Sequence, residues 1–268
     1  MPTYHRGMET TDRQVGSGAD LTARVGIITG AASGIGLATA RAAARLGARL
    51  AIADLAADGL EEVAASLRGQ GAEVVAVAGD LTQEEHLEKL AAAADDLGPL
   101  DFAINVAGIG YGGPVAELDL EGWRRAIDIN LTGCFLSMKH ELRAFARLGR
   151  PGSIVNVSSS VGASIAIPGA GPYAAAKAGV VMLSKCAALE VGAAGVRVNV
   201  VAPGGTETPF VADQDPEMRA GLIARHPLGR FGSADEIAEA AIWLASDAAS
   251  FVTGTVLSVD GGFSALSR

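Results

Sequence analysis

A tyrosine and a lysine four residues apart, Tyr173 and Lys177, have the types and spacing that proton transfer requires. On a helix such a pair lies on one face, one turn apart. A phenol has an ordinary pKa near ~10, and a neighbouring ammonium lowers that pKa toward the neutral range. The preceding serine cluster, residues 158–160, could hold a substrate oxygen. The spacing alone is also typical of a surface tyrosine beside a solvated lysine, so the functional interpretation depends on the rest of the chain.

Residues 29–36 form a glycine-rich sequence, TGAASGIG, between a short apolar run and a helical stretch. Glycine permits a tight strand-to-helix turn and a close approach of the backbone to a ligand. The N-terminus of the following helix presents free N–H groups and a positive dipole end to a pyrophosphate. In this context the pattern predicts a dinucleotide site formed by Gly30, Ser33, Gly34, Ile35 and Gly36.

Asp54 stands at the end of the second expected strand. A carboxylate at this point can accept hydrogen bonds from the adenosine ribose hydroxyls, and it repels a 2′-phosphate. No arginine or lysine lies in the glycine turn or just after Asp54 to neutralise such a phosphate. The sequence therefore favours NAD over NADP.

Short β-rich runs alternate with longer helical stretches along most of the chain, and the alternation predicts βαβ units around a parallel sheet. Expected strands cover 24–29, 49–53, 73–78, 100–105, 152–157, 197–201 and 256–259. Expected helices cover 34–46, 56–69, 83–97, 120–148 (long and bent), 172–193 and 234–246. The fold class is therefore α/β, a doubly wound parallel sheet of about seven strands with helices on both faces. The least regular stretch, 204–232, is expected to be a mobile segment near a site.

Composition limits the possible function classes. The 268 residues are 49% hydrophobic and 19% charged, which is typical of a folded protein, and the net charge of −9 argues against a nucleic-acid partner. We expect residues 1–20 to be a flexible tail and 21–268 a single domain. Without a membrane-length apolar run or a signal-peptide pattern, a cytoplasmic protein is expected. Cys134 and Cys186 lack the spacing of a metal site or disulfide framework, so both are expected to be small buried hydrophobes and no metal is predicted.

Several motifs in one order resemble the short-chain dehydrogenase/reductase family, in its single-domain, NAD-preferring branch. They are the glycine turn, Asn105-Val-Ala-Gly108, the serine cluster, the Tyr173/Lys177 pair and Pro203-Gly204. The resemblance extends over about residues 21–263. It implies a Rossmann-type fold and reversible hydride transfer between a secondary alcohol and NAD, with a ketone as product.

The resemblance also implies a role for each catalytic residue. Tyr173 would be the general base in oxidation and the general acid in reduction. Lys177 would lower the pKa of that tyrosine and bind the nicotinamide ribose. Ser159 would polarise the substrate oxygen, and Asn130 would organise a water that links the lysine to solvent. Counting from the strand end selects Ser159, whereas counting back from Tyr173 by the family's usual separation selects Ser160; Ser159 is preferred, with Ser160 as the alternative.

Further cofactor contacts follow from the same resemblance, beside Tyr173 and Lys177 themselves. Asp80 and Leu81 would contact the adenine, and residues 203–208 would hold the nicotinamide carboxamide. The complete additional set is Leu55, Asp80, Leu81, Asn105, Ala107, Gly108, Pro203, Gly204, Thr206 and Thr208.

The substrate pocket is expected between residues 109–114, residues 161–168 and a substrate lid at 206–231. The first two segments contain no charge, which favours an uncharged, mostly apolar alcohol or ketone. The expected helices 120–148 and 172–193 are apolar on more than one face, and members of the family are commonly homotetramers. We therefore expect a homotetramer or homodimer.

Two other functions remain open. An NADPH-dependent 3-ketoacyl reductase would share every catalytic residue, and only Asp54 argues against it. A non-catalytic NAD-binding sensor would typically lack the tyrosine or the lysine. The enoyl-reductase branch sets its tyrosine further from the lysine, where this chain has Ala170 and Gly171, so that branch is disfavoured.

Overall fold

The computed structural model describes residues 19–212 and 215–265, and its centre is a seven-stranded sheet. The strand order is β3-β2-β1-β4-β5-β6-β9, and every neighbouring pair is parallel. The strands are β1 Val25–Thr29, β2 Arg49–Asp54, β3 Val74–Ala78, β4 Leu100–Asn105, β5 Gly152–Val157, β6 Val196–Pro203 and β9 Val256–Val259. This architecture confirms the doubly wound α/β fold.

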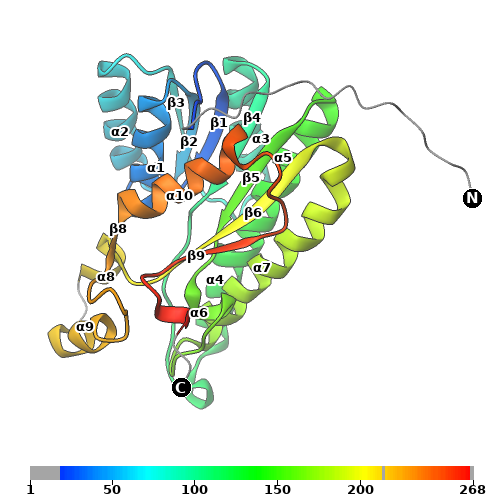
Figure 1. Cartoon of the computed structure of the whole chain (residues 1–268). Helices are drawn as coiled ribbons and strands as arrows, with labels where there is room; N and C mark the ends of the chain where they lie inside the picture. The colour runs from blue at the N-terminus through cyan, green and yellow to red at the C-terminus, as the bar shows by residue number, and fades with distance from the viewer. Residues whose placement is uncertain (1–18, 213–214, 266–268) are drawn as a thin grey trace, which may run out of the picture.

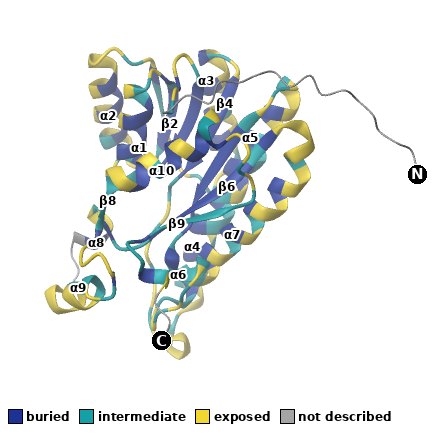
Figure 2. Cartoon of the chain, viewed as in Figure 1, coloured by how far each residue is buried: buried dark blue, intermediate teal, exposed yellow. Residues whose placement is uncertain are grey.

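Helices cover both faces of the sheet (Figure 1). On one face, α1 (Gly34–Arg45), α2 (Ala57–Gly69) and α10 (Ala234–Ala245) pack against the strands. On the other, α3 (Glu84–Leu97), α5 (Gly133–Leu148) and α7 (Gly171–Val191) do so. Figure 2 shows buried strands between helices whose outer faces are exposed. The strands are continuous apolar runs because both of their faces are covered.

The strand order reverses between β1 and β4, since the chain first builds β1-β2-β3 outward and then returns to add β4-β5-β6 on the other side. At such a switch point the two loops that leave adjacent strand ends turn in opposite directions and open a crevice. The glycine turn after β1 and the residues after β4 therefore face each other across this crevice.

The single helix expected at 120–148 consists of three pieces. α4 (Leu120–Ile127) continues into a π-helix, Asp128–Thr132, and then into α5. The expected bend is thus a local change in hydrogen-bond register, of the kind that often occurs at functional sites.

The stretch at 204–232 is more regular than its composition suggested. It contains β7 (Thr206–Glu207), α8 (Pro209–Ala212), α9 (Pro216–Ile223) and β8 (Gly232–Ser233), and β7 pairs with β8. Figure 1 shows β8, α8 and α9 grouped beside the sheet. A short helix α6 (Ser160–Ala163) also follows β5 directly.

Residues 1–18 of the expected tail lie outside the described residues. Cys134 is half-buried, but Cys186 is exposed on α7, so the prediction of two buried cysteines is wrong for Cys186. Among the helices of the described ranges, none has both the length and the apolar character that a membrane crossing requires.

Candidate active site

A cavity of about 980 Å³ opens at the carboxyl ends of β1 to β6. Its lining brings together nearly all of the site residues predicted from the sequence. They are Gly30, Ser33, Gly34, Ile35, Gly36, Asp54, Leu55, Asp80, Leu81, Ala107, Gly108, Asn130, Ser159, Tyr173, Lys177, Pro203, Gly204, Thr206 and Thr208. One predicted residue, Asn105, does not line the cavity.

The glycine turn is a close-packed cradle in which side chains have no room. Gly30 has φ +72°, and a Cβ there would lie 2.8 Å from the backbone nitrogen of Ala107. A Cβ on Gly36 would lie 1.9 Å from the carbonyl oxygen of Gly30. Ser33, at the N-cap of α1, makes no side-chain capping bond within the described residues. The first N–H groups of α1 are thus available to an anion, and the cradle fits the pyrophosphate of a dinucleotide.

The Asp54 carboxylate is fixed by two main-chain donors. Its Oδ2 accepts a hydrogen bond from the N–H of Ala32 at 3.0 Å, and its Oδ1 accepts one from Ala56 at 3.0 Å. The first of these bonds ties the carboxylate to the glycine turn. Each oxygen keeps a lone pair for a further donor, as ribose hydroxyls would require.

Tyr173 and Lys177 lie in the first two turns of α7. The Lys177 side chain is buried, its Nζ donates to the carbonyl oxygen of Val157 at 3.0 Å, and Nζ lies 5.8 Å from the centroid of the Tyr173 ring. Phe210 of α8 packs near the other side of the site, with its ring centroid 6.1 Å from that of Tyr173. The pair predicted from spacing therefore meets inside the cavity and not on the surface.

The pKa directions differ from the expectation for Tyr173. Burial raises the pKa of the Tyr173 phenol, and a hydrogen bond with the Ser159 side chain opposes the rise. Burial also lowers the pKa of Lys177 to about 8. The expectation of a lowered tyrosine pKa is wrong for this structure, because removal from water is the largest effect on the phenol.

The three serines of the cluster have different partners. Ser158 Oγ donates to the carbonyl oxygen of Lys177 at 2.8 Å, and Ser160 Oγ donates to that of Pro203 at 2.7 Å. Ser159 is half-buried, lines the cavity, and its Oγ accepts only the N–H of Val161 at 3.2 Å among the described residues. Ser160 is completely buried. This geometry supports Ser159 as the serine that faces a substrate.

Asn130 lies in the π-helix and is buried. Its Nδ2 donates to the carbonyl oxygens of Ile109 (3.0 Å) and Ala126 (2.9 Å), and its Oδ1 accepts the N–H of Ile109 at 3.1 Å. Both amide protons are thus used within the protein, and Oδ1 keeps one lone pair. A Cβ on Gly108 would lie 2.6 Å from Asn130 Oδ1 and 3.2 Å from Lys177 Nζ, so both side chains approach the backbone at Gly108.

Asn105 supports the site from below. Its Nδ2 donates to Asn156 Oδ1 at 2.9 Å and to Glu141 Oε2 at 3.0 Å. The side chain is buried at the end of β4, directly before the residues that line the cavity. Asn105 therefore supports the segment after β4 that lines the cavity, but does not itself line the cavity.

His226, which no sequence pattern indicated, is buried and lines the cavity. Its Nε2 accepts the N–H of Gly205 at 3.0 Å, its Nδ1 bonds the carbonyl oxygen of Leu222 at 2.8 Å, and its ring stacks on Phe263. The two bonds require a neutral ring protonated on Nδ1. His226 thus joins the C-terminal end of α9 to the loop after β6. No periodic pattern surrounds it in the sequence, so no signal there singled it out.

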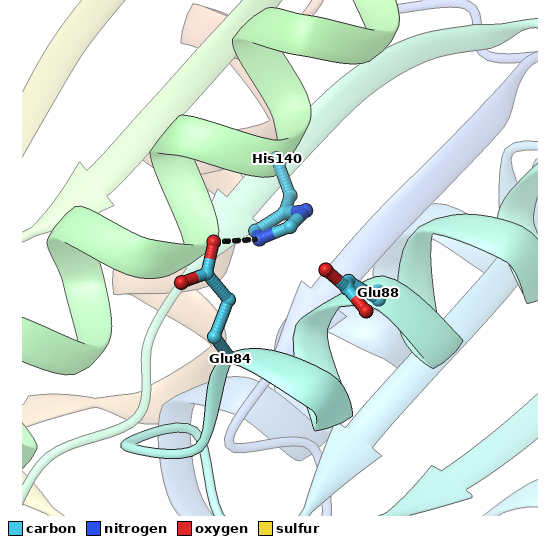
Figure 3. A group of neighbouring side chains, drawn as sticks. All are labelled: Glu84, Glu88 and His140. Carbon is cyan, nitrogen blue, oxygen red and sulfur yellow. Dashed lines mark hydrogen bonds and ion pairs between the residues drawn. The ribbon is translucent and has the colours of Figure 1, made fainter.

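A second group of titratable side chains, Glu84, Glu88 and His140, lies between α3 and α5 (Figure 3). Glu84 hydrogen-bonds Lys139, and its Oε1 lies 3.2 Å from His140 Nε2 and 3.8 Å from Arg143. The Lys139 cation already compensates the Glu84 carboxylate, and the Glu84 pKa is lowered chiefly by its bond with Lys139. We interpret this group as an ion-pair cluster that joins two helices.

Similar proteins were found by family, by sequence and by structure. A family model described as Enoyl-(Acyl carrier protein) reductase matches residues 30–264. The chain is 47% identical over 245 residues to a cis-4-hydroxycyclohexanecarboxylate dehydrogenase from Sinomonas cyclohexanicum, with 91% of this chain and 97% of that protein covered. It is 42% identical over 253 residues to a 2,5-dichloro-2,5-cyclohexadiene-1,4-diol dehydrogenase from Sphingobium indicum, with 92% and 100% covered.

Among solved structures, a short-chain type dehydrogenase/reductase from Mycobacterium marinum superposes with a TM-score of 0.87 at 34% identity. The superposition covers 91% of this chain and 96% of that one. The family-model match, over residues 30–264, includes nearly all of the glycine turn, the serine cluster and the Tyr173/Lys177 helix. The chain belongs to the short-chain dehydrogenase/reductase family.

Proposed function

We propose that this protein oxidises a secondary alcohol on a six-membered carbon ring to the ketone, with NAD as the hydride acceptor, and catalyses the reverse reaction. The observation that carries the proposal is that Tyr173, Lys177 and Ser159 line the same cavity as the glycine cradle. A proton-transfer pair and a dinucleotide cradle in one cavity are what alcohol oxidation requires.

Tyr173 would take the proton from the substrate hydroxyl as general base, and would return it as general acid in the reverse direction. Ser159 would hold the substrate oxygen by a hydrogen bond beside Tyr173. Bound NAD would supply the electrophilic nicotinamide carbon that accepts the hydride. Glycine-cradle N–H groups would bind its pyrophosphate, and the segment from Pro203 to Thr208 would hold the nicotinamide.

Lys177 would compensate the negative charge of the Tyr173 phenolate, and Asn130 would help to conduct the proton to solvent. A buried phenolate needs a compensating cation, and the Lys177 ammonium lies 5.8 Å from the ring. Oδ1 of Asn130 can accept a hydrogen bond from a water, which would give the proton a route past Lys177 to solvent.

The substrate end of the cavity favours an apolar ring. Its lining is formed by apolar side chains of the 109–114 and 161–168 segments and of α8 and α9. They include Ile109, Val161, Ile167, Pro168, Phe210, Met218 and Leu222. Two relatives bear the names of enzymes that act on hydroxylated six-membered rings, which supports the same substrate class here.

Asp54 supports NAD over NADP. Its carboxylate faces the cavity and is held by Ala32 and Ala56, so it cannot easily turn away from a 2′-phosphate. No arginine or lysine neighbours it in the turn. The same residue argues against an NADPH-dependent 3-ketoacyl reductase, the second candidate.

The outer faces of α4, α5 and α7 support self-association. They expose large apolar side chains that a monomer would leave in water, namely Leu120, Trp123, Phe135, Met182 and Leu189. We propose that these faces meet in a homodimer or homotetramer.

The function is tested by following nicotinamide absorbance with cyclohexanol, cis-4-hydroxycyclohexanecarboxylate and a 3-hydroxyacyl thioester, each with NAD and with NADP. We expect turnover of a ring alcohol with NAD, and reduction of cyclohexanone with NADH. Preferred turnover of the thioester with NADP would establish the ketoacyl reductase instead. NADH binding without turnover of any of these substrates would contradict the proposed activity.

A further inference from the structure

Glu141 of α5 is a buried acid beneath the cavity, and only 2% of it is exposed. It begins a hydrogen-bonded row of polar side chains that runs along one face of the sheet, from α5 past β4 and β5 to α7. Glu141 Oε2 accepts from Asn105 Nδ2 of β4, the same Nδ2 donates to Asn156 Oδ1 of β5, and Asn156 Nδ2 donates to Ser184 Oγ of α7 at 2.9 Å. The catalytic roles proposed above do not involve Glu141, Asn156 or Ser184.

Two oxygens of these hydrogen-bonded side chains have no hydrogen-bond partner among the described residues. They belong to two residues that are hydrogen-bonded to each other. They are Oε1 of Glu141 and Oδ1 of Asn105. Both protons of Asn105 Nδ2 are used, one toward Glu141 and one toward Asn156. If Glu141 were ionised, both free oxygens would be buried acceptors with nothing to accept, which is costly for each.

Nor does a cation balance a negative charge on Glu141. Within the described residues, no lysine, arginine or histidine lies within ion-pair distance of Glu141. The titratable groups around this row of side chains are Cys134, on the same helix, and Lys177 of α7, which interacts with Cys134. A buried unpaired carboxylate is far less stable than the neutral acid.

We propose that Glu141 is a protonated carboxylic acid in the native protein, that its Oε1–H donates to Asn105 Oδ1, and that this pair is a positioning device for the cofactor site. A planar acid and a planar amide each offer one donor and one acceptor side by side, so the two groups complement each other. The existing bond from Nδ2 to Oε2 is one half of this pair, and the proton on Oε1 supplies the other half. Burial raises the pKa of Glu141 to about 8, which agrees with this state.

The pair acts on the cofactor site through the end of β4. Asn105 is the last residue of β4, and the next residues, Val106, Ala107 and Gly108, line the cavity beside the glycine turn. The N–H of Val106 is bonded to Thr29 Oγ1 at 3.1 Å, so this segment also joins β4 to β1. Loss of the Glu141 proton would set two acceptor oxygens against each other and loosen the segment that the cofactor contacts.

The first test is spectroscopic and does not depend on the proposed function. In infrared difference spectra of wild type against Glu141→Gln, we expect the stretch of a buried protonated carboxyl at neutral pH. The band should disappear as the pH rises through about 8. Glu62→Gln, which removes an exposed glutamate of α2, is the matched control and should leave the band in place. A band that is absent from wild type, or that remains in Glu141→Gln, overturns the proposal.

The second test measures the effect on the cofactor site and rests on the proposed function for its probe, NADH. Gln at position 141 keeps both bonds of the pair at every pH, whereas Leu removes both. When the pH is raised to one unit above the midpoint of the Glu141 titration, the NADH affinity of wild type should fall up to about tenfold more than the affinity of Glu141→Gln. The reason is that only wild-type protein with a protonated Glu141 binds NADH well. Lys177 and Tyr173 titrate in both proteins, so this difference isolates Glu141. Glu141→Leu, with its fold checked by circular dichroism, should bind weakly at all pH values.

These outcomes separate the two proposals. If wild type and Glu141→Gln show the same pH dependence of NADH binding, Glu141 is not a positioning residue. If wild type does not bind NADH at all, the proposed function fails, while the infrared band still decides the protonation of Glu141.

Discussion

The Nζ atom of Lys177 lies 5.8 Å from the centre of the Tyr173 ring while it donates a hydrogen bond to the carbonyl oxygen of Val157. The lysine is therefore anchored to the end of β5 and presents its charge to the tyrosine from a fixed position. Both groups are removed from water, and burial raises the pKa of the phenol while it lowers that of the lysine to about 8.

Tyr173→Phe should lower kcat by about 10²-fold or more, because the proton of the substrate hydroxyl then has no acceptor. The ring and its packing near Phe210 would remain, so NADH should bind nearly as in wild type. Steady-state kinetics and NADH fluorescence titration check the two parts separately. Activity within about tenfold of wild type, a barrier change of only ~1.4 kcal/mol, would rule out this assignment.

Two neighbouring serines should respond differently to alanine. Ser159→Ala should reduce kcat, because the hydroxyl beside Tyr173 is lost, with little change in melting temperature. Ser160→Ala should instead destabilise the fold by about 1–3 kcal/mol, because the buried carbonyl of Pro203 loses its donor. Kinetics and thermal melts of both variants distinguish them. The opposite pattern would identify Ser160 as the substrate-facing serine.

Asp54→Ala should change both cofactor preference and turn stability. Removal of the carboxylate takes away the repulsion of a 2′-phosphate, so the preference for NAD over NADP should shrink about tenfold or more. The N–H groups of Ala32 and Ala56 also lose their acceptor, so a loss of stability of about 1 kcal/mol is expected. KM values for both cofactors and a melting curve measure the two effects. An unchanged ratio of the KM values for NAD and NADP would show that Asp54 does not distinguish the two riboses.

The protonation of Glu141 should make stability depend on pH. Its pKa is raised from the ordinary value of 4.5 to about 8, so the native state keeps a proton that the unfolded chain releases. This stabilisation is fully present below pH 4.5 and is lost as the pH rises through about 8. Within that window, wild type should lose up to about 1.4 kcal/mol per pH unit relative to Glu141→Gln. Denaturant unfolding of both proteins at a series of pH values measures the difference; parallel pH curves would contradict it.

His226→Phe should loosen the loop after β6. The new ring can still stack on Phe263, but the N–H of Gly205 and the carbonyl oxygen of Leu222 lose their partner. We expect a higher KM for NAD and a loss of about 1–3 kcal/mol in stability. His226→Gln, which returns an acceptor toward Gly205, should recover part of the cofactor affinity. If the Phe variant binds NADH as wild type does, the two hydrogen bonds do not position the loop.

The sheet and its covering helices could be predicted because buried parallel strands are continuous apolar runs in the sequence. Each expected strand lies within two residues of an observed one, and β6 differs most, since it continues to Pro203. The π-helix at 128–132 could not be predicted, because a single shifted hydrogen bond leaves no periodic signal. α9 and the β7–β8 pair were missed because they are short and depend on contacts with distant residues such as Phe231 and Gly205.

The site shows the same division between local and distant information. Tyr173, Lys177 and the glycine turn could be identified from spacing within one segment. The choice between Ser159 and Ser160 could not, because it depends on which hydroxyl reaches Pro203. The direction of the Tyr173 pKa was wrong because burial is a property of the folded chain. Glu141 looks like an ordinary helix-surface acid in sequence, and only the packing of α5 on β4 shows otherwise.

The π-helix at Asp128–Thr132 also constrains how this chain can change in length. Deletion of one residue there would restore an uninterrupted α-helix from α4 to α5, because a π-turn holds one more residue than an α-turn. The flanking helices would stay aligned, but the segment that holds Asn130 would change shape and the Asn130 amide would leave Ile109. Descendants of this protein can therefore replace residues in this segment more easily than they can gain or lose one, and alignment gaps should avoid it.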